Sequence, residues 1–417
     1  MPLTILRSRE TRAAVGEGQL RVISTYALAL LAAVSMFDFG LPDQRPSRPI
    51  GVAAAGVCLL ALGIEGRRRR MTSAHLLATV VVGIVCLSST WSKAPEANTA
   101  AFSAIQLLVL FMLAFEFLDN RAAWNRIAGG LAVGGGALTL LVLRQFLSGV
   151  TVNGGRYTGF SKGDPNDVAW GIAIGTTLLI HFAFETRSAR LRWGLGALAA
   201  LGVPATVLTG SRSGVLVLIV GLVIVPWRLA WAGPRSRARF SFLLIVGLLG
   251  VAAMIPSDAD FRGVDRVLAG KGGEGEGSVV ERTELLKESF NIIGAHPIKG
   301  VGVAGGENAM LERLGIPLAV HNSFASVAVQ AGLIAAGAWL LLWFVLVRTS
   351  WRAHGALRPI ATALTLLTLA ELMVRHAEYQ KPLWLIAALA MSTSFAPGPG
   401  SLPHGEIRRA SLALPNE

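Results

Sequence analysis

Long apolar segments recur along almost the whole chain and constrain its fold more than any other feature. An α-helix needs roughly 20 apolar residues to cross the hydrocarbon layer of a bilayer, within a range of about 17–25. By this criterion we predict about twelve spans and an all-α polytopic transmembrane helix bundle. The spans lie near residues 21–39, 50–65, 73–91, 100–118, 127–147, 167–185, 192–209, 214–232, 240–256, 321–347, 358–374 and 382–396.

The composition supports a membrane protein and argues against other classes. Charged residues make up 15% of the chain, against roughly 25% in soluble domains. The net charge of +13 could indicate nucleic-acid binding. However, Lys and Arg form short clusters between spans and no basic face interleaved with aromatic residues, so we expect no nucleic-acid partner. Cys58 and Cys86 lie inside apolar spans, which argues against a disulfide framework or a thiolate metal site.

The basic clusters also predict the orientation. If the N-terminus is cytoplasmic, every cluster falls on the cytoplasmic side, as the positive-inside rule requires. The N-terminal arginines precede an apolar run without a cleavage site, which predicts an uncleaved signal anchor. We therefore expect a multi-pass membrane protein whose other loops face outward; in a bacterium the membrane is the inner membrane and the outward side is the periplasm. Its parts are a cytoplasmic segment 1–20, spans one to nine over 21–256, a large periplasmic loop 257–320, spans ten to twelve over 321–396 and a cytoplasmic tail 397–417.

The large periplasmic loop is the one long polar stretch between spans. The bilayer gives such a stretch no structural reason to exist, so we expect it to carry function. Residues 279–293 predict an amphipathic helix on the membrane face, with Arg282 on its first turn. Residues 271–277 are glycine-rich and are interpreted as a flexible loop. The D-x-D pattern of Asp258 and Asp260 is too short to indicate a metal site, so we expect no metal and no other cofactor.

Cations in the predicted outer loops need a reason of their own, because positive-inside topology selects against them. Arg156, Lys162 and Asn166 precede the sixth span, where residues 165–167 predict a turn and a helix N-cap. This segment is either a surface turn or an anion site, with Arg156 and Lys162 binding next to the helix N-terminus.

The very short loop between spans seven and eight carries Ser211 and Arg212. Ser211 can cap the following helix. Arg212 either snorkels to lipid headgroups or binds phosphate. We favour phosphate, because a guanidinium is always charged and can donate two parallel hydrogen bonds.

Three further outer segments contain candidate residues. His296 and Lys299 lie in the large loop, where His296 is either structural or catalytic. His321 and Asn322 open the tenth span, and histidine is the commonest general base near neutral pH, so we predict a catalytic or substrate-contacting role for His321. Arg375 either binds substrate or forms a self-neutralising i,i+4 pair with Glu371.

The ordered set of these motifs resembles the O-antigen ligase and O-antigen polymerase superfamily of bacterial membrane glycosyltransferases. The resemblance covers most of residues 20–395 and is strongest over 200–345. It rests on Arg156 with Gly159-Phe160 and Pro165-Asn166, Thr209-Gly210-Ser211-Arg212, Glu281-Arg282, His296-Pro297-x-x-Gly300-x-Gly302, and His321-Asn322 followed by Gly332-Leu333. It implies a GT-C type enzyme that takes a glycan from an undecaprenyl-diphosphate carrier without a metal.

Carried over residue by residue, the resemblance implies that Arg212 and Arg282 contact the diphosphate and that His321 acts as the base or orients the acceptor. Candidate substrate-binding residues are Arg156, Lys162, Asn166, Ser211, Asn322, His296, Lys299 and Arg375. A ligase would use lipid A-core as the acceptor, whereas an O-antigen or exopolysaccharide polymerase would use a lipid-linked glycan. The motifs do not separate the two, and we favour the ligase. A more distant alternative is a transporter of lipid-linked glycans, which would place charges near the bilayer midplane.

Overall fold

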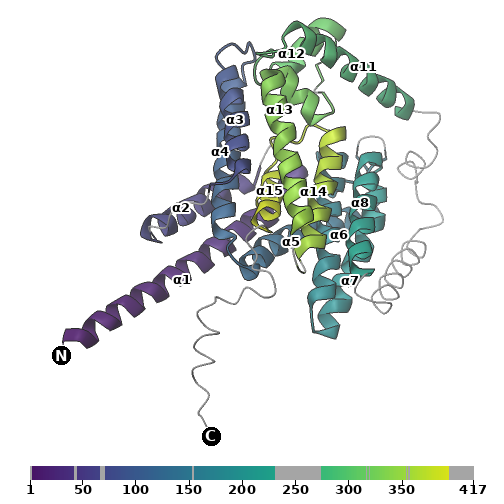
Figure 1. Cartoon of the computed structure of the whole chain (residues 1–417). Coiled ribbons are helices and arrows are strands. Elements are labelled where there is room, and N and C mark those ends of the chain that lie inside the picture. Colours follow the sequence, from purple (N-terminus) through teal and green to yellow (C-terminus); the bar gives the residue numbers. More distant parts are fainter. Residues whose placement is uncertain are drawn as a thin grey trace.

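The predicted spans coincide with apolar helices in the computed structural model of the chain (Figure 1). The structure describes residues 2–41, 45–65, 71–152, 155–230, 274–315, 317–318, 320–353, 355 and 357–393. It is 79% helical, and the described ranges contain no strand. The helices are α1 (Pro2–Ser35), η1 (Phe37–Phe39), α2 (Ser47–Glu65), α3 (Ser73–Ser88), α4 (Ala97–Phe117), α5 (Arg121–Leu147), α6 (Pro165–Glu185), α7 (Ala189–Leu208), α8 (Arg212–Ala230), α11 (Glu274–Ala295), α12 (Gly306–Leu314), α13 (Ser323–Arg352), α14 (Leu357–Val374) and α15 (Lys381–Ser392).

The all-α membrane bundle is thereby confirmed. Among the described residues, eight helices are long and apolar enough to cross a membrane. Three shorter apolar helices coincide with the predicted spans three, eight and twelve: Ser73–Ser88, Arg212–Ile224 and Lys381–Ser392. The predicted ninth span, 240–256, lies outside the described residues, so the total of about twelve stays a prediction.

Glycines on α5 let it approach two neighbours closely. A Cβ added at Gly130 would lie 2.1 Å from the carbonyl oxygen of Ala29 on α1, and one added at Gly135 would lie 2.5 Å from the Cα of Gly175 on α6. Small residues at helix contacts are typical of membrane bundles, where close packing rather than the hydrophobic effect holds helices together. α6 consequently lies among α5, α7, α8 and α14 and is buried along most of its length.

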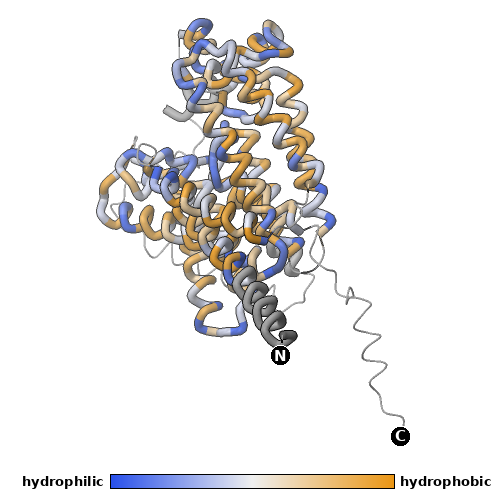
Figure 2. Tube along the Cα trace, turned by 90° about the vertical axis from the view of Figure 1, so that its left-hand side faces the viewer, coloured by the Kyte–Doolittle hydropathy of each residue, from blue (hydrophilic) through white to orange (hydrophobic). Residues whose placement is uncertain are grey.

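Polar residues gather at the two ends of the bundle, while hydrophobic residues follow the helices (Figure 2). At one end, Arg21 near the middle of α1 pairs with Glu65 at the end of α2 (2.6 Å) and with Asp119 just after α4 (3.0 Å). Arg121 at the start of α5 pairs with Glu185 at the end of α6. The ends of α2, α4 and α6 therefore lie on the side where α5 begins, which is the alternation that the predicted topology requires.

The described part of the large loop consists of α11 and α12, which lie beside the first half of α13 (Figure 1). Leu285 and Ile292 of α11, Met310 of α12 and Val329 of α13 form a small core of their own. The predicted helix 279–293 is thus present. It begins earlier than predicted, at Glu274, because isolated glycines such as Gly275 cost a helix only about 1 kcal/mol each.

This earlier start corrects two predictions. Residues 274–277 are the first turn of α11 and not a flexible loop, and Arg282 lies on the third turn and not the first. The side chain of Arg282, like Asp258, Asp260 and residues 271–273, lies outside the described part of the structure.

A break in α13 explains why glycines recur in two distant motifs. Gly332 has φ 82° and ψ 175°, which interrupts the helical backbone. The segment 297–302 docks into this break. Its backbone hydrogen bonds run from the N–H of Val301 to the oxygen of Val329 (2.8 Å), from the N–H of Gly302 to the oxygen of Gln330 (2.9 Å) and from the N–H of Leu333 to the oxygen of Pro297 (2.8 Å). The motif around His296 and the pair Gly332-Leu333 are two halves of one joint.

Replacing Gly332 by alanine tests this joint. The new Cβ would lie 2.0 Å from the carbonyl oxygen of Ile298, and its left-handed φ adds about 1–2 kcal/mol of strain. We expect Gly332→Ala to lower the melting temperature of the purified protein strongly. Gly337→Ala, on the same helix with nothing within 4 Å of the added Cβ, should leave it unchanged or slightly higher. Equal melting temperatures for the two variants would show that the joint contributes no stability.

Candidate functional site

The loops predicted to face outward meet at the end of the bundle opposite Arg21. They bring together side chains far apart in the sequence: Asp38, Arg156, Asp164, Ser211, His321 and Arg375. The contacts among these loops define the candidate site.

Arg156, Asn166 and Ser211, three of the predicted binding residues, form one hydrogen-bonded cluster. Arg156 donates from Nε to the carbonyl oxygen of Thr209 (2.7 Å) and from Nη2 to Asn166 Oδ1 (3.2 Å). Ser211 Oγ donates to the same oxygen of Asn166 (2.8 Å) and accepts from the N–H of Gly214 (3.1 Å). Ser211 therefore caps α8, as predicted, and the cluster ties the start of α6 to the start of α8.

Arg212 and Lys162 lie beside this cluster with exposed side chains. Arg212 is the first residue of α8, directly after Ser211. The N-terminus of a helix carries a partial positive charge, so a guanidinium at this position adds to a field that favours anions.

Arg375 is buried among three carboxylates. Its guanidinium lies 2.5 Å from Asp167 Oδ1, 3.1 Å from Asp164 Oδ2 and 3.5 Å from Glu371 Oε1. Gln380 also donates to Asp167 (2.6 Å). These contacts favour the self-neutralising pair with Glu371, extended by two aspartates, over substrate binding by Arg375.

The electrostatics of Asp164 connect this ion cluster to the rest of the site. Burial raises the pKa of Asp164, but the opposing effects of Arg375, the N–H of Asn166, Arg156 and His321 are larger, so the pKa lies below its usual range. For Arg375 the signs are reversed: burial lowers the pKa, and the three carboxylates outweigh burial and raise it. Arg156 and His321 therefore both lie near enough to Asp164 to act on its charge.

Asn322 and His321 have different surroundings. Asn322 is the N-cap of α13: its Oδ1 accepts from the N–H groups of Phe324 (2.9 Å) and Ala325 (3.0 Å), and its Nδ2 donates to the oxygen of Met373 (3.0 Å). Its contacts are thus structural. His321, half-buried just before this cap, lies with its ring centre 6.0 Å from that of His376.

A cavity of about 450 Å³, lined by apolar and polar side chains, adjoins His376. Its polar lining consists of Glu96, Glu307, Ser326, Gln330, His376, Glu378 and Tyr379. Glu378 is buried and accepts hydrogen bonds from the hydroxyls of Ser323 (2.8 Å) and Ser326 (2.7 Å). Carboxylate and amide groups around such a space can accept hydrogen bonds from a ligand rich in hydroxyl groups.

His296 and Lys299 do not join the Arg156 cluster through any hydrogen bond or ion pair of the described residues. Both are exposed, in the segment that docks against α13. The backbone N–H of His296 donates to the oxygen of Ile292, and its carbonyl accepts from Gly300. These contacts involve only the backbone of His296, so the role of its side chain stays a prediction.

Sequence reasoning misses several residues of this end of the bundle. Asp164 and Asp167 flank Asn166, and the need of a buried Arg375 for carboxylates is the signal that could have found them. Arg45 and Arg48 lie in the first outer loop, where the rule that selects Arg156 also applies to them.

The fold and these outer loops define a multi-pass membrane protein with a charged site at one end. Comparison with known families then confirms the resemblance to the O-antigen ligase superfamily. Residues 197–340, less than half of the chain, match the family described as O-antigen ligase. The matched range contains Ser211, Arg212, Arg282, His321 and the joint in α13. Over that range the chain is similar to the membrane ligases and polymerases of this superfamily.

No curated protein matches the sequence. Among solved structures, the chain is similar to one from a structure titled "Structural coordination of polymerization and crosslinking by a peptidoglycan synthase complex", with a TM-score of 0.39 and 16% sequence identity. The similarity covers 77% of this chain and 96% of that one. A TM-score this low supports no argument about function.

The buried ion cluster predicts a large loss of stability on removal of Arg375. Arg375→Ala leaves Asp164, Asp167 and Glu371 without their shared cation, which typically costs about 3–5 kcal/mol. Arg313→Ala is the matched control, because its pair with Glu288 is exposed and such pairs contribute little to stability. We expect a much lower melting temperature for Arg375→Ala alone. Similar values for both variants would mean that the cluster does not hold the outer end together.

Proposed function

We propose that the protein transfers a glycan from an undecaprenyl-diphosphate carrier to an acceptor sugar at the periplasmic face of the bacterial inner membrane. The observation that carries this proposal is the convergence of the outer loops on one site within and beside the family-matched range. That site combines Arg156, which hydrogen-bonds to Asn166 at the start of α6, with Arg212 and His321, which lie at the starts of α8 and α13. Cations suit a diphosphate leaving group, and an imidazole suits the deprotonation of a hydroxyl.

The reaction needs little equipment beyond these groups. The bond between the anomeric carbon and the phosphate oxygen breaks, and its electron pair stays on the departing diphosphate. The acceptor oxygen forms the new bond to that carbon, and its proton passes to His321. Arg212 and Arg282 stabilise the charge that develops on the diphosphate, where loss of one such contact typically costs about 3–4 kcal/mol.

The Arg156 cluster has a positioning role in this scheme. Its hydrogen bonds through Asn166 and Ser211 hold the start of α8 against the start of α6, and so fix the position of Arg212, the first residue of α8. The ion cluster of Arg375 holds α14 against α6 from the other side. The cavity beside His376 offers a place for the hydroxyl groups of the acceptor.

The proposed chemistry uses these cations and needs no metal. A sugar diphosphate carries its own leaving group, and the arginines supply the positive charge that a metal supplies in other transferases.

Substitution of the proposed catalytic residues tests this function. In a transfer assay with a purified lipid-linked glycan donor and EDTA, we expect Arg212→Ala and Arg282→Ala each to reduce the rate by about 10²–10³-fold. His321→Ala should reduce it by about 10²–10⁴-fold. Arg190→Ala, an exposed arginine at the start of α7, should retain wild-type activity. Wild-type rates in all three variants, or wild-type transfer that requires Mg²⁺, would reject the scheme.

We further propose that the acceptor is lipid A-core, which makes the protein an O-antigen ligase. The family description supports this choice. The alternative within the same superfamily is an O-antigen or exopolysaccharide polymerase with a lipid-linked glycan as the acceptor.

The glycan profile of a deletion strain distinguishes the two. For a ligase we expect long lipid-linked polymer to accumulate and lipopolysaccharide to lack it. Accumulation of single lipid-linked repeat units would identify a polymerase instead.

A further inference from the structure

A second site candidate is a groove of about 500 Å³ between α4 and the pair α1 and α2. Its wall on α4 extends from Thr99 to Leu113, which is about 20 Å at 1.5 Å per residue. The other wall is largely apolar and includes Leu28, Leu31 and Val52. Val52 and Phe102 are among the most exposed large apolar side chains, so the groove is open on the side that faces lipid.

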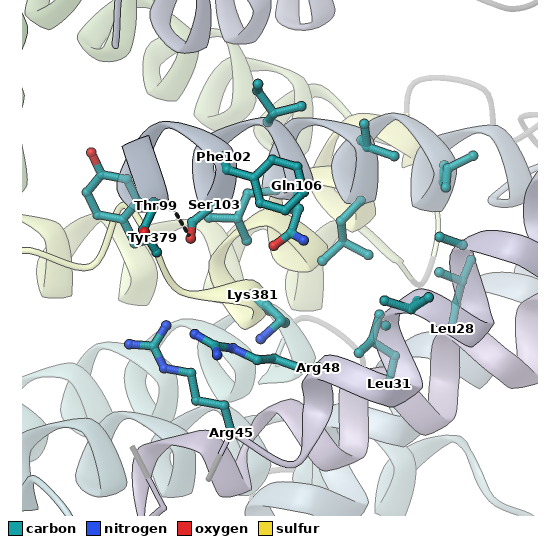
Figure 3. Close-up of a pocket in the computed structure, with 18 residues that line it drawn as sticks. Leu28, Leu31, Arg45, Arg48, Thr99, Phe102, Ser103, Gln106, Tyr379 and Lys381 are labelled. Carbon is teal, nitrogen blue, oxygen red and sulfur yellow. Dashed lines mark hydrogen bonds between the residues drawn. The ribbon is translucent and has the colours of Figure 1, made fainter. Parts of the chain in front are cut away.

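Cations gather at one end of this groove. Figure 3 shows the guanidinium groups of Arg45 and Arg48 and the amine of Lys381 together, away from Leu28 and Leu31 at the other end of the groove. Lys381 pairs with Asp38 (2.8 Å). The side chain of Arg48 is exposed and makes no hydrogen bond or ion pair with any described residue. The end of the groove therefore carries more positive than negative charge among the residues that the structure describes.

Two helix N-termini add to this positive field. α2 begins at Ser47 and α15 begins at Lys381, and neither helix has an acidic residue in its first turn. Arg48 lies within the first turn of α2, where the helix dipole disfavours a cation. Such an arrangement is unfavourable by itself and becomes favourable when an anion binds between the cations and the helix ends.

A polar side chain on the lipid-facing wall also lacks a partner. Gln106 lines the groove with Thr99 and Ser103, and its exposed side chain makes no hydrogen bond with any described residue. Unpaired polar groups at membrane depth are costly and usually functional. Gln106 thus points to a ligand with polar groups near one end and an apolar chain beyond.

We propose that this groove binds a polyprenyl phosphate, with its phosphate at Arg45, Arg48 and Lys381 and a single isoprenoid chain along α4. A volume of about 500 Å³ is too small for a lipid with several acyl chains, whereas a single isoprenoid chain can lie along the groove. The choice of a polyprenyl lipid as the ligand rests on the proposed glycan transfer. The existence of an apolar groove with cations at one end does not depend on that function. The site is separate in its residues from Arg212 and Arg282.

Tyr379 connects this groove to the proposed transfer site. It lines both the groove and the cavity next to His376, whose ring lies 6.0 Å from that of His321. Tyr379 therefore lies between the groove and the cavity. The groove would hold the polyprenyl carrier before or after it occupies the transfer site.

Binding of a fluorescent polyprenyl monophosphate to the full chain in nanodiscs tests the proposal without any transfer step. The measurement uses an Arg212→Ala background, so that the other phosphate site does not mask the result. We expect Arg48→Glu, which reverses a charge, and Ala55→Trp, which fills the groove, each to weaken binding about tenfold or more. Arg190→Glu should bind as the background does. Elution profile and melting temperature confirm that each variant is folded.

Two ligand controls and one further variant complete the test. Polyprenol, which lacks the phosphate, should bind more weakly and be insensitive to Arg48→Glu, and an added hexa-acylated lipid A should not displace the polyprenyl phosphate. Unchanged binding in both groove variants, or displacement by lipid A, would overturn the proposal. His321→Ala should keep the binding and lose transfer, so failure of the groove and failure of the proposed function give different results.

Discussion

The buried guanidinium of Arg375 is the contact on which the outer end of this bundle depends. It lies after α14 and binds Asp164 and Asp167 at the start of α6, together with Glu371 of its own helix. A charge in such a position is stable only while its partners stay in place. It therefore fixes the ends of helices that are distant in the sequence, and the side chains of the site are positioned by those ends.

The joint in α13 has a similar role on the other side of the site. Gly332 opens the helical backbone, and the segment 297–302 supplies the missing hydrogen bonds. The loop thereby becomes part of the bundle's framework, and the start of α13, with His321 and Asn322, is held in one position. The Arg375 ion cluster and the joint at Gly332 thus fix the positions of a few polar groups at a membrane face. Apolar packing around these groups would not orient them by itself.

The sequence predicted the architecture well because lipid imposes strong rules. Apolar length marked the spans, and the positions of Arg and Lys marked the sides. Capping chemistry identified Ser211 as the cap of α8, and the apolar run of the tenth span placed Asn322 at a helix start. The start of α11 was predicted too late, since glycines at 275 and 277 indicate a loop locally while the helix is stabilised by packing of its later turns against α13.

Contacts between distant segments, such as Arg375 with Asp164, leave no local pattern in the sequence. Arg48 is also a cation on the outer side, where positive-inside topology selects against it, but it belongs to none of the motifs that carry the resemblance.

In the proposed mechanism, the outer cations bind a lipid diphosphate while His321 receives the proton of the acceptor hydroxyl. A cryo-electron microscopy structure of the protein with an undecaprenyl-diphosphate-linked glycan bound tests it most directly. The account predicts density for the diphosphate beside Arg212, with the first sugar facing His321. Density for the diphosphate at the opposite end of the bundle, near Arg21 and Arg121, would contradict it.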